Sequence, residues 1–122
     1  FLSHSSLDNP FVRELRKALY SICETFFDET DIYFSQSITA RLNEELINSH
    51  ALVLVFSKNA STSEWVQKEW ASMLHLNKAV IVVRIDTAPV PPLLADIKYI
   101  DCGENVQSAC DGISIALGKI KI

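Results

Sequence analysis

Apolar runs of the kind found in buried strands alternate along the chain with segments of helical periodicity. The clearest strand is Ala51–Phe56, which is apolar at every position, as expected of a strand covered on both faces of a parallel sheet. Ala79–Val83 has the same character. Shorter apolar runs predict three further strands at Phe1–Leu2, Thr25–Phe27 and Ile97–Ile100.

Four segments carry apolar residues at helical spacing. The first follows Asp8-Asn9-Pro10, an N-cap residue before a first-turn proline, and runs to Ile22. The second starts at the cap residue Ser37. The third follows a capping box at Ser61–Glu64 and runs from about Ser63 to Leu76. The fourth runs from Val106 to Leu117. The alternation predicts an α/β fold, a flavodoxin-like, doubly wound, five-stranded parallel sheet with helices on both faces.

Composition narrows the class of protein. A chain of 122 residues with 48% hydrophobic residues and a net charge of −4 is long enough for one compact domain with its own core. The chain has 11 basic and 15 acidic residues, and the basic residues form no cluster. Both features argue against direct binding of nucleic acid or of an anionic membrane. Three cysteines without disulfide-like spacing favour a reducing compartment, so we expect a cytoplasmic protein.

Glycine and metal-ligand spacing exclude further functions. The first glycine is Gly103, so a glycine-rich phosphate loop is excluded over the preceding hundred residues. Cysteines and histidines are scattered without the spacing of a zinc site, so we expect no metal.

Ligands of open α/β sheets bind beyond the carboxyl ends of the strands. The polar residues predicted at those ends are Ser3, His4, Ser5, Asp28, Ser57 and Asp86. A response-regulator receiver needs acidic residues after the first strand and a phosphoacceptor aspartate after the third, where this chain has Ser3-His4 and Ser57, so that function is excluded. A flavin carrier remains open, because hydroxyls and free amides before a helix can hold a phosphate.

One face of the predicted third helix combines a carboxylate with aromatic residues. Glu69 lies one turn after Trp65 and borders an apolar stripe. That stripe contains Val66, Trp70 and Met73. Such surroundings desolvate a carboxyl group and raise its pKa, as in carboxyls used for chemistry. Spacing alone equally allows a surface carboxylate paired with Lys68 or Lys78.

Three segments together resemble the Toll/interleukin-1 receptor (TIR) domain family, in its bacterial type. Phe1–Ser5 resembles the first family box, Phe27-Asp28-Glu29 the second strand entering the BB loop, and Ser57–Glu69 the stretch that ends in Trp-x-x-x-Glu. The resemblance covers essentially the whole chain. We therefore expect residues 1–122 to form a single TIR domain, excised from a longer multidomain protein.

The resemblance implies an enzyme. The glutamate of Trp-x-x-x-Glu, here Glu69, is the catalytic residue of NAD+ glycohydrolases, which release nicotinamide and ADP-ribose or a cyclic ADP-ribose-type product. NAD+ is then the substrate, and no cofactor is implied. Trp65 would wall or stack against the nicotinamide side of the pocket. The other substrate-binding residues implied are Ser3, His4, Ser5, Asp28 and Ser57.

The resemblance also implies self-association. The BB loop would pair with neighbouring TIR domains through Glu29, Asp31, Tyr33, Phe34 and Ser35. This loop lacks the glycine common in the family, so we expect a different shape with Tyr33 and Phe34 as contact residues. The partners implied are other TIR domains, in a homo-oligomer or filament, and a sensor domain of the full-length protein.

Two functions follow from these residues. One is an NAD+-cleaving effector of antiviral defence or immune signalling that is activated by self-association. The alternative is a non-enzymatic TIR–TIR assembly or adaptor module. Glu69 favours the enzyme, because signalling-only members of the family typically lack this glutamate.

Overall fold

Four parallel strands form the sheet in the described part of the chain. The computed structural model describes residues 1–20, 22, 46–94 and 99–119. The strand order is β1-β2-β3-β4, and every pair of neighbours is parallel. The strands are β1 (Leu2–Ser3), β2 (Ala51–Phe56), β3 (Ala79–Arg84) and β4 (Ile100–Asp101). This is the parallel α/β sheet that the sequence predicts.

Helical segments connect the strands. The described helices and 3-10 turns are η1 (Ser6–Asp8), α1 (Asn9–Leu19), α3 (Lys58–Ser61), α4 (Glu64–His75), η2 (Pro92–Leu94) and α5 (Val106–Gly118). Residues 46–48, just before β2, are also helical. Helical crossovers of this kind are what parallel neighbouring strands require.

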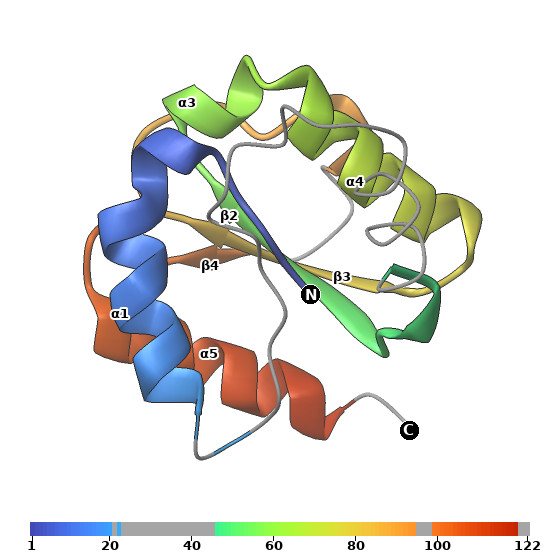
Figure 1. The fold of residues 1–122 in the computed structure, drawn as a ribbon. Coiled ribbons are helices and arrows are strands. Elements are labelled where there is room, and N and C mark those ends of the chain that lie inside the picture. Colours follow the sequence, from blue (N-terminus) through green and yellow to red (C-terminus); the bar gives the residue numbers. More distant parts are fainter. Residues whose placement is uncertain (21, 23–45, 95–98, 120–122) are drawn as a thin grey trace.

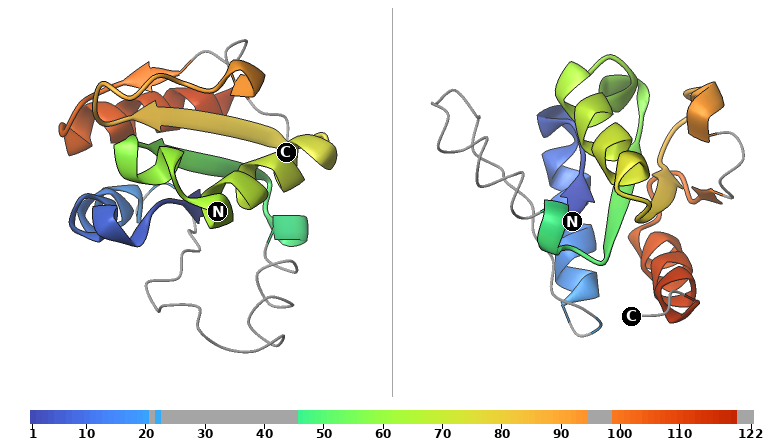
Figure 2. Two further views of the ribbon diagram at one scale, coloured as in Figure 1. Left: turned by 90° about the horizontal axis from the view of Figure 1, so that it is seen from above. Right: turned by 90° about the vertical axis from the view of Figure 1, so that its right-hand side faces the viewer.

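The sheet separates two apolar cores, and the figures show helices on both sides of it (Figures 1 and 2). On one face α1 and α5 pack against alternate residues of β2, including Val53 and Val55. On the other face α3 and α4 pack against the intervening residues, including Leu52 and Leu54. Because both faces are covered, every residue of β2 is buried, which explains its uninterrupted apolar sequence.

The register of β1 determines which way its two residues point. Leu2 pairs with Val53 and belongs to the core beneath α1 and α5. Ser3 pairs with Leu54, whose side chain belongs to the core beneath α4. Because successive side chains of a strand point to opposite faces, Ser3 projects toward α4.

Several local predictions need correction. The short helix α3 was not predicted, and Ser61 is its last residue rather than the cap of the next helix. The N-cap of α4 is Ser63, whose hydroxyl accepts a hydrogen bond from the Val66 amide at 3.2 Å. Helix α1 ends at Leu19, so Ile22 lies beyond it and is exposed.

The remaining elements fall partly or wholly outside the described residues. The last strand is observed at Ile100–Asp101, so it overlaps the predicted range Ile97–Ile100 at Ile100. Outside the described residues lie the predicted strand at 25–27, the start of the helix expected after Ser37, and the site residues Asp28, Glu29, Asp31, Tyr33, Phe34 and Ser35.

Packing of α5 against β4 leaves no room beside Gly112. A Cβ atom at this position would lie 2.7 Å from Cδ1 and 2.9 Å from Cγ1 of Ile100. We expect Gly112→Ala to lower the free energy of unfolding by about 1 to 2 kcal/mol, because overpacking outweighs the better helix propensity of alanine. Gly118→Ala is the matched control, since nothing lies within 4 Å of its added Cβ. Urea unfolding gives the free energy of unfolding of both variants, and an equal loss in the two would contradict the close packing of Gly112 against Ile100.

Candidate functional site

A buried serine and a buried glutamate meet between β1 and α4. The Ser3 hydroxyl donates a hydrogen bond of 2.8 Å to Oε1 of Glu69. Ser3 is 0% exposed and Glu69 is 7% exposed. Ser3 projects from β1, while Glu69 lies in the middle of α4, which packs against β1, β2 and β3. Two residues 66 positions apart thus form a polar pair at an otherwise apolar helix–sheet contact.

Burial changes the acidity of Glu69. Desolvation raises its pKa from 4.5 to about 7, and hydrogen bonds from the Ser3 and Trp65 side chains oppose part of this rise. The apolar stripe predicted beside it is buried and consists of Val66, Trp70 and Met73. The prediction of a desolvated carboxyl group with a raised pKa is therefore confirmed.

The alternative interpretation of Glu69 as a surface carboxylate is wrong. Its side chain is buried, and the ammonium group of Lys78 is engaged elsewhere. Lys78 Nζ donates to the backbone carbonyls of Leu46, Ile47 and Ser49 at the end of the helical residues before β2. Cations stabilise helix carboxyl ends in this way.

The turn between β1 and α1 contains two more of the predicted site residues. His4 Nε2 lies 2.6 Å from Oδ1 of Asn9, and the ring nitrogen donates because an amide oxygen can only accept. The Ser5 hydroxyl accepts from the Leu7 amide at 3.3 Å and caps η1. Both side chains therefore help to shape the turn that follows Ser3.

A second turn, between β2 and α3, is joined to this one through Asp8. The Ser57 hydroxyl caps α3 by accepting from the Ala60 amide, and it donates to Oδ2 of Asp8. Asn59 Nδ2 donates to the other oxygen of Asp8 at 3.1 Å. Asp8 is the N-cap residue of α1 and a proline stands in the first turn, as predicted. Its side chain makes no cap hydrogen bond, and the carboxylate joins the β1–α1 and β2–α3 turns instead.

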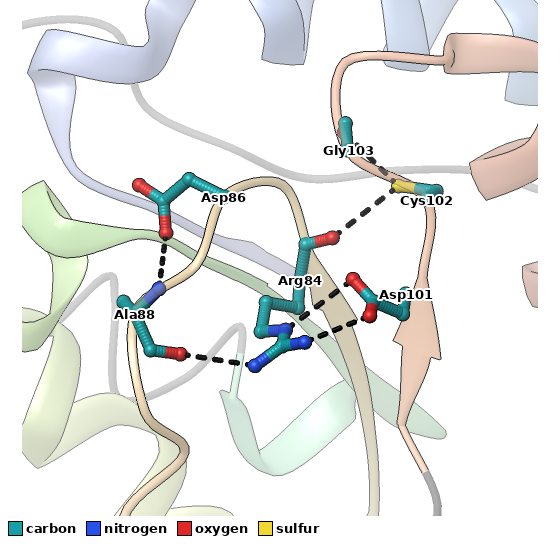
Figure 3. A network of polar contacts seen from close by, with 6 residues as sticks. All are labelled: Arg84, Asp86, Ala88, Asp101, Cys102 and Gly103. Carbon is teal, nitrogen blue, oxygen red and sulfur yellow. Dashed lines mark hydrogen bonds and ion pairs between the residues drawn. The ribbon is translucent and has the colours of Figure 1, made fainter.

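A separate network holds the carboxyl ends of β3 and β4 together (Figure 3). The Arg84 guanidinium donates to both carboxylate oxygens of Asp101, at 2.7 and 3.3 Å, and lowers the pKa of that carboxyl group. Asp86 accepts from the backbone amides of Ala88 and Lys58, at 2.9 and 2.8 Å. Asp86 thus ties the loop after β3 to the start of α3.

The cysteines are thiols of ordinary or reduced reactivity where the structure describes them. Cys102 and Cys110 are both free, and burial raises the pKa of each thiol. The Cys102 thiol donates to the carbonyls of Arg84 and Gly103 in the same network (Figure 3). Raised pKa values disfavour the nucleophilic thiolate.

The structure therefore brings together three of the predicted site residues, Ser3, Trp65 and Glu69. His4, Ser5 and Ser57 lie on the turns next to this group, and their polar atoms make contacts within the protein. Asp28 lies outside the described residues. Asp8 was not among the predicted site residues, since no local pattern reveals a contact across 49 positions. Direct contact of these side chains with a substrate stays a prediction.

The architecture of the sheet and the family comparison together identify the kind of domain. The sheet is flavodoxin-like, and a buried serine–glutamate pair lies between its first strand and the helix that follows β2 and α3. The family model for the TIR domain matches residues 1–114, and the chain thus belongs to the TIR domain family. A comparison with curated proteins finds no match.

No helix in the described ranges is both long and apolar enough to span a membrane.

Proposed function

We propose that this TIR domain is an NAD+ glycohydrolase in which Glu69 is the catalytic residue. The proposal rests chiefly on the carboxyl group of Glu69, which is buried. It accepts a hydrogen bond of 2.8 Å from the Ser3 hydroxyl and a further hydrogen bond from the Trp65 side chain. A carboxyl group whose pKa is shifted to about 7 by burial is of the kind found at functional sites. Its position in the Trp65-x-x-x-Glu69 sequence of a TIR domain supports the same assignment.

The reaction breaks the bond between the anomeric carbon of the ribose and the nicotinamide nitrogen. The bonding electron pair leaves with nicotinamide, which departs as a neutral molecule, and positive charge develops on the ribose. The ionised Glu69 carboxylate stabilises that charge in a low-dielectric environment, where electrostatic interactions are strong. Water then adds to the anomeric carbon and loses a proton to yield ADP-ribose. Attack by a nucleophilic group of the substrate itself, with loss of a proton from that group, yields a cyclic product instead.

Other residues and partners complete the proposal. Trp65, half-buried on the same face of α4 as Glu69, stacks against the nicotinamide. His4, Ser5, Ser57 and Asp28 line or rim the substrate site. Association with further TIR domains through the BB loop raises activity, and a sensor domain in a longer protein controls it. The proposed setting is cytoplasmic immune or defence signalling.

Nicotinamide release from NAD+ tests this function directly. We expect the domain to release nicotinamide, with a rate per molecule that rises with protein concentration and with a crowding agent, because association completes the site. A rate per molecule independent of concentration would contradict the role of association. Silence from folded protein, including protein tethered into oligomers, would contradict the enzyme and favour the assembly module.

A further inference from the structure

Ser3 is placed to act on Glu69 rather than on a ligand. Its side chain is 0% exposed, and its hydroxyl hydrogen points to Oε1 of Glu69 at 2.8 Å. The backbone of Ser3 is fixed by its parallel pairing with Leu54 of the central strand β2. A fully buried hydroxyl on a strand offers a donor in a constant position and no surface for a substrate.

We propose that Ser3 is a positioning residue for Glu69, whose buried hydroxyl holds the Oε1 atom and favours the ionised carboxylate that cleaves NAD+, without binding NAD+ itself. This inference rests on the proposed function. It replaces direct substrate contact by Ser3 with an effect on the protonation of the carboxyl group.

The physical basis is a charge-assisted hydrogen bond. A hydroxyl that donates to a carboxylate stabilises its ionised form more than its neutral form, and such bonds are about twice as strong as neutral ones. Burial works in the opposite direction and raises the pKa of Glu69 to about 7. Ser3 therefore keeps the carboxyl group ionised over a wider pH range than burial alone would allow.

Few charged groups of the described residues compete with this effect. The strands β2 and β3 are apolar from 51 to 56 and from 79 to 83. Arg84, at the end of β3, is paired with Asp101. The ionisable side chains of α3 and of the rest of α4 are exposed, and they are Lys58, Glu64, Lys68 and His75.

The test compares the titration of Glu69 in the parent protein and in Ser3→Ala. The side-chain carboxyl carbon of Glu69 is followed by 13C NMR and assigned with Glu69→Gln. We expect the midpoint in Ser3→Ala to lie about one pH unit above the parent midpoint. The acidic limb of the kcat/KM profile for NAD+ should move by the same amount, so that the loss of activity is about tenfold at pH 6 and shrinks as pH rises. Ser3→Cys, with a weaker donor of similar size, should give an intermediate midpoint.

Ser63→Ala is the matched control, because Ser63 caps the same helix through the Val66 amide and does not contact Glu69. It should lower stability and leave the Glu69 midpoint unchanged. An unchanged midpoint in folded Ser3→Ala and Ser3→Cys would overturn the role of Ser3. A shifted midpoint in a protein without turnover would overturn the proposed function and support the control of Glu69 by Ser3.

Discussion

Replacing Glu69 by glutamine is expected to lower kcat/KM for NAD+ cleavage about a thousandfold, the size of effect seen when a preorganised electrostatic group is removed from an active site. Glutamine keeps the volume and one oxygen acceptor of the side chain, so the Ser3 hydroxyl retains a partner. What it removes is the negative charge that stabilises the developing cation. Glu69→Ala should be equally inactive, and nicotinamide release measures both variants.

Glu64→Gln is the matched control for this experiment. Glu64 is exposed and lies in the first turn of the same helix, one residue after the cap Ser63. Its replacement removes the same charge from α4 without touching the Ser3–Glu69 pair, and activity should stay near the parent value. Residual activity of Glu69→Gln within about tenfold of the parent would assign the charge stabilisation to another group.

Glu69→Gln is also expected to make the folded protein more stable than the parent at alkaline pH. The pKa of Glu69 is about 7 in the folded protein against 4.5 for an exposed glutamate. Because folding raises this pKa, the protonated carboxyl group adds to the free energy of unfolding of the parent. This contribution is fully present below pH 4.5 and is lost as the pH rises through 7. The stability of Glu69→Gln relative to the parent should therefore rise by about 3 kcal/mol between pH 4 and pH 8.5.

Urea unfolding of both proteins across this pH range checks the expected gain. Glu64→Gln again serves as control, since an exposed carboxylate should produce little such change. A parent protein and Glu69→Gln with parallel pH profiles would show that Glu69 titrates normally. A gain in stability together with a loss of turnover is the expected mark of a residue kept for function at the expense of folding.

Much of the architecture is predictable from local pattern. The uninterrupted apolar sequence of β2 indicates a strand covered on both faces, and the structure buries all of it. Helical periodicity places α4 and α5 within one or two residues of their observed bounds. Local pattern failed at short-range details, such as the extra turn α3, because several serines near residue 60 can each act as a cap.

Helical spacing in the sequence is enough to place Glu69 on the same helix face as Trp65 and beside a buried stripe, because helical geometry fixes which residues are neighbours. The hydrogen-bond partner of Glu69 on the sheet, in contrast, depends on how separate elements pack. Ser3 and Glu69 meet because β1 pairs beside β2 and α4 packs across both strands. In the same way, tertiary packing directs the carboxylate of the N-cap residue Asp8 to Ser57 and Asn59 and not to the amides of its own helix. A hydrogen bond forms only within a few tenths of an ångström of its ideal length, and that distance depends on how separate elements pack.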